Sequence, residues 1–387
     1  MRTLIYAHAF APSIGGAQTY AMLLARGMAA EGGNGRNEID VELVTKTAAD
    51  GFDDATLPFR VIRRPRLPTL WLLVGKADLV HLVGPAFLPL LLGLVRGRPV
   101  VIEHHGYQAV CPNGLLFYQL TKSNCPGHFM ARRYLECIRC NARSSGWVQS
   151  LTRLIVTFPR RWMCTRATVN VPITRHVDRR LRLPRSRVVY YGLPDEGRAP
   201  DDANGSATFA YVGRLVEEKG LPVLIKAARK LREGGTNFTL RFIGDGPGRR
   251  DLEALAEENL LGDVTEFTGL LREERLKQVL REITAVVIPS VMEETAGLAA
   301  IQQMMSGRLV IASDIGGIAE VVDGAGFLFP PGDDDALALC MLQAIRDPDA
   351  SSRLGAAARD RASRYFGLER MVAEHLAIYR DVTKARV

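Results

Sequence analysis

Short apolar runs alternate with amphipathic segments along the chain, and this alternation occurs twice. In the first half the apolar runs lie at 3–10, 41–46, 77–84, 99–106, 166–174 and 186–192. In the second half they lie at 209–215, 238–246, 264–269, 285–290, 309–313 and 326–330. Strands that alternate with helices predict parallel sheets covered by helices on both faces. The sequence therefore predicts an α/β protein with two doubly wound, Rossmann-like domains.

A polar stretch without periodicity, at 196–207, is the predicted linker between the two domains. It divides the chain into a first domain over 1–195, a second domain over 208–360, and a helical tail over 361–387 that can cross back to the first domain. A chain of 387 residues that is 47% apolar and 24% charged is not a disordered or fibrous protein.

The sequence also predicts where the protein is found. The strongly apolar, uncharged run at 79–95 has 17 residues, fewer than the roughly 20 that span a bilayer. The first residues are typical of a buried strand, not of a signal peptide. Six cysteines in this length do not indicate a disulfide scaffold. We therefore expect a cytoplasmic protein.

Basic residues are concentrated in the first domain. Residues 1–206 carry 27 Lys and Arg against 15 Asp and Glu, whereas the remainder carries 23 against 27. The segment 132–187 alone has 14 basic and 2 acidic residues. Such a segment indicates an anionic partner (a membrane surface, a nucleic acid or a phosphorylated substrate), and an ordinary solvated face is the alternative.

A glycine-containing loop follows the first predicted strand of each domain. Gly15 and Gly16 begin a helix, where a ligand can approach the backbone and free amides can bind an anion. This loop lacks the G-x-G-x-x-G pattern, which disfavours a nicotinamide cofactor. In the second domain Gly213 is followed by Arg214 and Lys219. A guanidinium and an ammonium on one loop suit a diphosphate, and two solvated cations are the alternative.

The segment 289–317 carries the most information about chemistry. Glu294 lies in the loop after the strand at 285–290, and Gly297 opens a helix whose first amides can hold a phosphate. Gln302 follows about one turn into this helix. A carboxylate beside such a helix start is well placed to accept hydrogen bonds from sugar hydroxyls.

Taken in order, these motifs resemble the family-4 retaining glycosyltransferases, which have the GT-B architecture of two Rossmann-like domains facing a central cleft. The resemblance covers nearly the whole chain. It rests on an ordered set of residues: Gly15-Gly16, His105-Gly106, Gly213-Arg214, Lys219-Gly220, Gly244-Asp245-Gly246-Pro247, the FTG sequence at 267–269, and the block from Glu294 to Gly317.

The resemblance implies an activity and a set of site residues. The activity is transfer of a sugar from a UDP- or GDP-sugar to a hydroxyl of a glycan or lipid-linked acceptor, in cell-envelope or polysaccharide biosynthesis, with retention and without a required metal ion. The implied catalytic residues are His105, Arg214, Lys219 and Glu294. The implied donor-binding residues are Gly15, Gly16, Gly213, Gly244, Asp245, Gly246, Thr268, Gly297, Leu298 and Gln302.

Two positions depart from the family pattern. Gln302 replaces a second glutamate that holds the ribose hydroxyls in the family, and Ala296 replaces a frequent aromatic residue. Glutamine accepts a hydrogen bond but without the strength that charge adds. These two replacements make a nucleotide-sugar-binding protein without catalysis one alternative. The other is an epimerase or hydrolase of sugar nucleotides on the same fold, which would need further carboxylates for proton abstraction.

Four cysteines lie within thirty residues of an insertion at about 107–165. Cys137 and Cys140 have the C-x-x-C spacing of half a zinc site, which Cys111 and Cys125 would complete. The sequence thus predicts a structural zinc ion. Buried free thiols, a redox pair and an iron–sulfur cluster are the alternatives.

Arginines alternate with large apolar residues after these cysteines. This composition is typical of a helix that lies on an anionic membrane, and the alternative is an amphipathic helix packed on the first domain. The chain has no recognisable nucleic-acid-binding module, so nucleic acid is not an expected partner.

Overall fold

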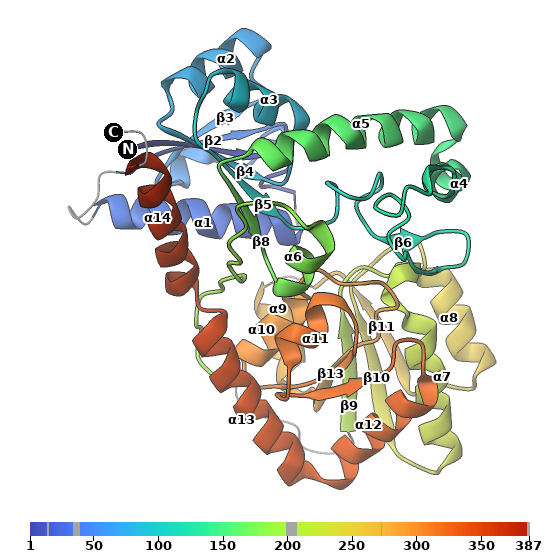
Figure 1. The fold of residues 1–387 in the computed structure, drawn as a ribbon. Coiled ribbons are helices and arrows are strands. Elements are labelled where there is room, and N and C mark those ends of the chain that lie inside the picture. Colours follow the sequence, from blue (N-terminus) through green and yellow to red (C-terminus); the bar gives the residue numbers. More distant parts are fainter. Residues whose placement is uncertain (14, 34–38, 199–206, 272, 385–387) are drawn as a thin grey trace. The chain divides into compact units, whose positions relative to one another are not determined.

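The computed structural model describes residues 1–13, 15–33, 39–198, 207–271 and 273–384. The chain divides into two compact units (Figure 1). The first unit comprises Met1–Thr121, Cys125–Pro194 and Tyr365–Val387, and the second comprises Lys122–Asn124 and Asp195–Arg364. Most of the predicted linker, from 199 to 206, lies outside the described residues.

The first unit contains a six-stranded sheet in the order β3-β2-β1-β4-β5-β8, and all its strand pairs are parallel. The strands are β1 (Arg2–Ala7), β2 (Asp40–Thr45), β3 (Arg60–Arg63), β4 (Leu79–Val83), β5 (Val100–His104) and β8 (Val169–Pro172). Two further short strands lie outside this sheet: β6 (Phe117–Tyr118) belongs to the first unit and β7 (Ser123–Asn124) to the second.

Among the described residues of this unit, seven helices accompany the sheet. They are α1 (Gly16–Gly33), α2 (Leu67–Lys76), α3 (Phe87–Val95), α4 (Tyr134–Ser145), α5 (Trp147–Arg166), α6 (Arg175–Leu181) and α14 (Leu368–Lys384). A 3-10 turn, η1 (Asp54–Thr56), lies between β2 and β3. The last helix, α14, packs against α1, although more than 300 residues separate them in the chain (Figure 1).

The second unit repeats this architecture with the strand order β11-β10-β9-β12-β13-β14, again in parallel pairs. The strands are β9 (Ala207–Val212), β10 (Phe238–Ile243), β11 (Thr265–Gly269), β12 (Ala285–Ile288), β13 (Leu309–Ser313) and β14 (Phe327–Phe329). The helices are η2 (Glu217–Lys219), α7 (Leu221–Glu233), α8 (Arg249–Glu258), α9 (Glu273–Arg281), α10 (Leu298–Met305), α11 (Gly316–Val322), α12 (Asp334–Arg346) and α13 (Pro348–Tyr365).

The hydrophobic pattern explains these elements. Every residue of β12 and β13 is buried, as expected for central parallel strands that helices cover on both faces. On α7, Leu221, Leu224, Ala228 and Leu231 are buried at spacings of three and four residues, which places them on one face of the helix. The prediction of two doubly wound parallel sheets is thus confirmed.

Two strand assignments differ from the sequence prediction. The apolar run at 186–192 forms no strand, although it meets β8 through a bridge between Asn170 and Ser186 and a hydrogen bond from the Val189 amide to the Pro172 carbonyl. Conversely β3, with arginine at each end, pairs with β2 as an edge strand that hydrophobicity did not indicate. Edge strands commonly carry charged residues, so their pairing depends on the neighbouring strand more than on an apolar pattern.

Candidate functional site

The residues predicted to bind the donor in the second unit follow the carboxyl ends of its strands. They follow β9 (Gly213, Arg214, Lys219), β10 (Gly244, Asp245, Gly246) and β12 (Glu294, Gly297, Leu298, Gln302). Thr268 is the penultimate residue of β11. Because β10 and β12 flank β9 on opposite sides, the order of the strands reverses between β9 and β12. Doubly wound sheets bind ligands at such a switch point. The loops after β9 and β12 are therefore the candidate donor site.

Two glycines let these loops touch through their backbones. Gly220 has a φ of +66°, and a Cβ at this position would lie 2.0 Å from the carbonyl oxygen of Pro289. Gly244 has a φ of +138°, and a Cβ there would lie 1.9 Å from the carbonyl oxygen of Gly213. Only glycine fits both positions without a backbone shift. The loop after β9 is thereby fixed against the loops after β10 and β12.

An ion pair with a buried carboxylate joins the loops after β9 and β12. The Lys219 ammonium lies 2.5 Å from Oε1 of Glu294, and the Ser290 hydroxyl donates to the same oxygen at 2.5 Å. Glu294 is only 8% exposed. Burial raises the pKa of this carboxyl, but the charge of Lys219 and the two hydrogen bonds outweigh burial and hold the pKa below its ordinary value. Glu294 is therefore ionised at neutral pH.

Backbone contacts fix the position of Glu294 relative to two helices. The Gly317 amide, at the start of α11, donates to the Glu294 carbonyl oxygen at 2.6 Å. Gly297, with a φ of +71°, is the residue that precedes α10, and Leu298 is the first residue of that helix. The first amides of a helix have no partner within it. Glu294 thus lies three residues before a group of backbone donors that can bind an anion.

Arg214 and Gln302 have exposed side chains that a ligand can reach. Arg214 follows Gly213 on the loop after β9, and Gln302 lies in the second turn of α10. Neither side chain forms a hydrogen bond or ion pair with a described residue. Asp245 and Thr268 instead bond locally, since Asp245 accepts from the next amide at 2.7 Å and the Thr268 hydroxyl donates to the next carbonyl at 3.0 Å.

The first unit brings its own predicted residues together. Gly15 and Gly16 lie at the start of α1, and His105 follows β5 directly. Tyr191 connects them, because its hydroxyl donates to the Gly16 carbonyl at 2.5 Å and its ring lies 5.5 Å from that of His105. Burial lowers the pKa of His105 to about 4, against the opposing charge of Glu103, so this imidazole is neutral at pH 7.

A fully buried acidic residue beside His105 was not predicted from the sequence. Glu103 accepts hydrogen bonds from the Tyr20 hydroxyl, at 2.6 Å, and from Nε2 of His375 on α14. Its other oxygen lies 3.8 Å from Nε2 of His105. Burial raises the pKa of the Glu103 carboxyl. The charge of His375 and its hydrogen bond are the main influences that outweigh burial, so this pKa lies below its ordinary value. In the sequence, the sign of this buried carboxylate was a single charged residue inside an apolar strand.

The four cysteines of the insertion lie close to one another in the structure. Cys111, Cys125, Cys137 and Cys140 are buried free thiols, close enough for their charges to interact. The Cys140 thiol donates to a backbone carbonyl at 3.5 Å. In the part of the chain that the structure describes, no three or more His, Cys, Asp or Glu side chains are arranged to hold a metal ion. The zinc ion and the iron–sulfur cluster stay predictions.

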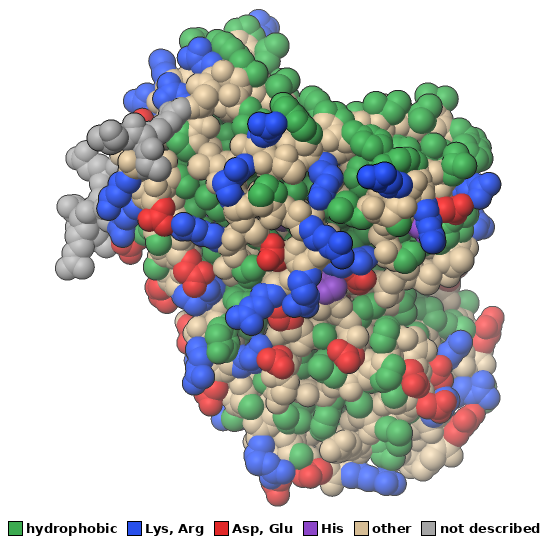
Figure 2. Space-filling view, in the orientation of Figure 1, with side chains coloured by type: hydrophobic (Ala, Val, Ile, Leu, Met, Phe, Trp, Pro, Cys, Tyr) green, Lys and Arg blue, Asp and Glu red, His purple; other side chains and the backbone are tan. Residues whose placement is uncertain are grey.

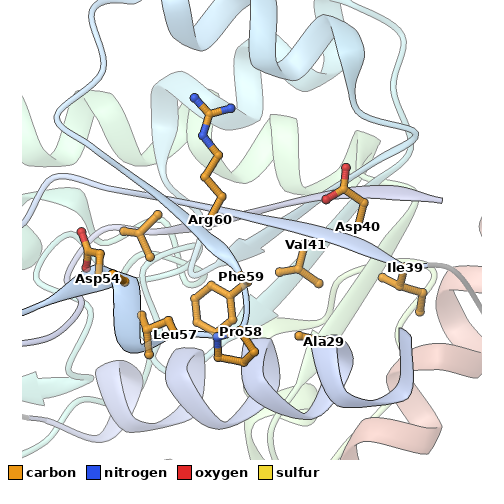
Figure 3. A pocket seen from close by; sticks show the side chains of 11 residues that line it. Ala29, Ile39, Asp40, Val41, Asp54, Leu57, Pro58, Phe59 and Arg60 are labelled. Atoms are coloured by element: carbon orange, nitrogen blue, oxygen red, sulfur yellow. The ribbon is translucent and has the colours of Figure 1, made fainter. Parts of the chain in front are cut away.

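A surface pocket of about 670 Å³ lies elsewhere in the first unit (Figure 3). Leu57, Pro58 and Phe59 line it above α1, together with Asp40 and Arg60 at the starts of β2 and β3 (Figure 3). It therefore opens at the amino ends of these strands, whereas Gly16 and His105 lie at the carboxyl ends. We assign no function to it.

Residues 196–361 match the family model described as glycosyl transferases group 1. The chain is 31% identical over 194 residues to the 2-deoxystreptamine glucosyltransferase of Streptomyces kanamyceticus, which covers 50% of this chain and 48% of that protein. It is 37% identical over 134 residues to WcaL of Escherichia coli, a putative colanic acid biosynthesis glycosyltransferase, over 33% of each chain. The chain thus spans about half the length of the first relative and a third of the second.

Solved structures resemble the whole chain. The sucrose-phosphate synthase of Thermosynechococcus elongatus has a TM-score of 0.75 at 22% identity and covers 99% of both chains. HepE of Anabaena, solved in complex with UDP-glucose, has a TM-score of 0.70 at 17% identity, covering 97% of this chain and 99% of its own. At these identities the likeness concerns the fold. Residues 196–361 form a domain of the glycosyl transferases group 1 family, and the chain as a whole has the two-domain GT-B fold.

Proposed function

We propose that this protein is a retaining glycosyltransferase, which moves a sugar from a nucleoside-diphosphate donor to the hydroxyl of an acceptor. The observation that carries the proposal is the pair of Lys219 and Glu294 at the switch point of a group 1 domain. Beside this pair lie an exposed guanidinium, that of Arg214, and the start of α10. Two cations and a set of free amides suit a diphosphate, and one ionised carboxylate suits the hydroxyls of a sugar.

In the proposed reaction the bond between the anomeric carbon and the diphosphate oxygen breaks, and a bond from that carbon to the acceptor oxygen forms on the same face. The leaving diphosphate gains negative charge, which Arg214 and Lys219 neutralise, and it takes up the acceptor proton. Preorganised cations at such a position stabilise the transition state without a metal ion. The first amides of α10, at Gly297 and Leu298, would bind the phosphates, and Glu294 would hold the donor sugar.

His105, a residue of the first unit, is proposed to contact the donor sugar. Because its pKa is about 4, it would act as a neutral hydrogen-bonding group and not as a cation. Neither of its ring nitrogens has a hydrogen-bond partner in the described structure. A buried polar atom without a partner is costly, so a sugar hydroxyl would satisfy it.

The comparisons support a UDP-sugar as the donor, since HepE was solved with UDP-glucose. A GDP-sugar is the second choice. The acceptor is proposed to be a glycan or a lipid-linked intermediate in polysaccharide or cell-envelope synthesis, as the name of WcaL suggests. We place the enzyme in the cytoplasm, at the inner face of the membrane.

The proposal is tested by incubating the protein with UDP-glucose and GDP-glucose, with and without a panel of hydroxyl acceptors. We expect glycosylated product only when acceptor is present, and an Arg214→Ala variant should lose about 2–4 kcal/mol of transition-state stabilisation, or roughly 30-fold to 1000-fold in rate. Arg353→Ala, on the exposed face of α13, is the control. Donor conversion without acceptor would indicate an epimerase or hydrolase, and binding without any conversion would indicate a non-catalytic protein.

A further inference from the structure

Large hydrophobic side chains are exposed on three neighbouring helices of the first unit. Thirteen of the twenty exposed large hydrophobic residues that the structure describes lie on α2, α3 and α5, and α3 packs against both of the others. We call them the apolar surface: Leu67, Trp71, Leu72, Phe87, Leu88, Leu91, Val95, Trp147, Val148, Leu151, Ile155, Phe158 and Trp162. Figure 2 shows hydrophobic side chains, with Lys and Arg among them, where these helices lie. Soluble monomers rarely expose so many apolar side chains in one place unless they bind a partner there.

All three tryptophans of the chain belong to this surface. Trp71 is 36% exposed, Trp147 64% and Trp162 56%. Tryptophan is normally among the more buried residues of a protein, and it is enriched where a protein meets the interface of a bilayer. Two of the three rings also contact a guanidinium: Arg96 lies 4.7 Å from the centre of Trp71, and Arg166 lies 5.3 Å from that of Trp162.

The charged residues on the three helices of the apolar surface have one sign. No aspartate or glutamate occurs within α2, α3 or α5. Five basic residues that are exposed lie on or beside these helices, namely Arg66, Lys76, Arg96, Arg143 and Arg166. None of the five forms an ion pair with a described residue. An apolar face bordered by unpaired cations is complementary to an anionic lipid surface, where the cations meet headgroups and the apolar side chains enter the acyl boundary.

We propose that α2, α3 and α5 form a docking surface for an anionic lipid bilayer. None of the described helices is both long and apolar enough to cross a membrane, so the contact would be peripheral. The charge pattern favours this occupant over a second copy of the chain, because a two-fold interface would bring the same unpaired cations together. The inference deepens the proposed function, since bilayer binding would bring the enzyme to a lipid-linked acceptor.

The test is co-flotation of the full chain with vesicles of phosphatidylcholine, with or without phosphatidylglycerol. We expect binding to the anionic vesicles only, and a decrease as salt is raised. Because every tryptophan lies on the apolar surface, binding should also shift the emission of the protein to shorter wavelength. The variant Leu151→Gln/Ile155→Gln, on the exposed face of α5, should bind roughly tenfold more weakly.

The matched control is Leu270→Gln/Leu339→Gln, which replaces two residues of similar exposure (76% and 67%) in the second unit. Equal loss of binding in the control, or unchanged binding of the α5 variant, would overturn the proposal. The proposal would also be overturned if the protein bound no vesicles and instead formed a dimer that the α5 substitutions dissociate. Transfer to a water-soluble acceptor is measured in parallel. Vesicle binding without transfer would refute the proposed function alone, and transfer without vesicle binding would refute this inference alone.

Discussion

Replacing Lys219 with methionine should change both the activity and the pH dependence of stability. The substitution keeps the length of the side chain but removes the charge that lies 2.5 Å from Glu294. Glu294 would then be a buried carboxylate with one hydrogen bond, from Ser290. Removing one partner of a buried pair costs about 3–5 kcal/mol. Because the Lys219 side chain is 24% exposed, we expect a loss of about 2–3 kcal/mol in the free energy of unfolding at pH 7.

The sign of the pH dependence follows from Glu294. In the natural protein its pKa is lowered, so its ionised form stabilises the fold above the ordinary carboxyl range, and this contribution is lost as pH falls through the lowered pKa. Without Lys219, burial is the largest remaining influence and raises this pKa. The carboxyl of the variant then contributes most below its ordinary pKa, and stability decreases as pH rises through the raised pKa.

Urea unfolding between pH 4 and pH 8 measures this difference. Lys219→Met should be most stable at mildly acidic pH, and Lys219→Met/Glu294→Gln should regain most of the loss at neutral pH. Lys230→Met removes a lysine whose ion pairs lie at the surface, with Asp334 and Asp335, and should change stability little. A pH profile of Lys219→Met that parallels the natural protein, or a loss no larger than that of the Lys230 variant, would show that Lys219 does not stabilise the charge of Glu294. In the transferase assay, we expect a decrease of roughly 100-fold to 1000-fold in kcat.

Three further outcomes are expected. Gln302→Glu should tighten binding of uridine, which has the ribose but no phosphates, by about 1 kcal/mol, measured by calorimetry, because a charged acceptor strengthens a hydrogen bond to ribose; unchanged affinity would remove Gln302 from the nucleotide site. Glu103→Gln should lower the free energy of unfolding by about 3 kcal/mol at pH 7. The difference from the natural protein should shrink as pH falls, because the pKa of Glu103 is lowered in the fold and acid therefore removes the stability that its ionised form contributes. A constant difference across pH would contradict this. Metal analysis of protein purified without chelator should find about one zinc per chain if the predicted site forms, and Cys140→Ala should then lower the zinc content; protein without zinc, whose melting temperature chelators leave unchanged, would reject the site.

Local sequence signals were sufficient for most of the fold and for part of the site. The apolar runs located β12 and β13, because central parallel strands are buried on both faces. The loop residues after β9 and β12 could be grouped in advance, since parallel strands bring their carboxyl ends to one edge. What the sequence did not indicate was that Lys219 and Glu294 would form an ion pair with each other. That contact depends on the backbone approach at Gly220, a tertiary feature.

The contacts around Glu103 could not be predicted from the sequence. Its partner His375 is 272 residues away in the chain and reaches it only because α14 packs on α1. Neither residue has a spacing or a motif that points to the other. The strand predicted at 186–192 was wrong for a more local reason. This segment meets the edge strand β8, but Pro172 has no amide hydrogen with which to continue the ladder.

The charge balance of the donor site gives the replacement at position 302 a physical meaning. Arg214 and Lys219 supply two positive charges, and Glu294 cancels one of them. The same loops also carry Glu217, Glu218 and Glu293, so a glutamate at position 302 would add to a negative total, whereas Gln302 leaves the loops one charge more positive toward a diphosphate. The glutamine thus weakens a single hydrogen bond to the ribose and strengthens the attraction for the phosphates, which is the interaction that must grow as the leaving group gains charge. On this argument, the departure from the family pattern moves binding energy from the nucleoside toward the reacting diphosphate and leaves the catalytic charges of the site in place.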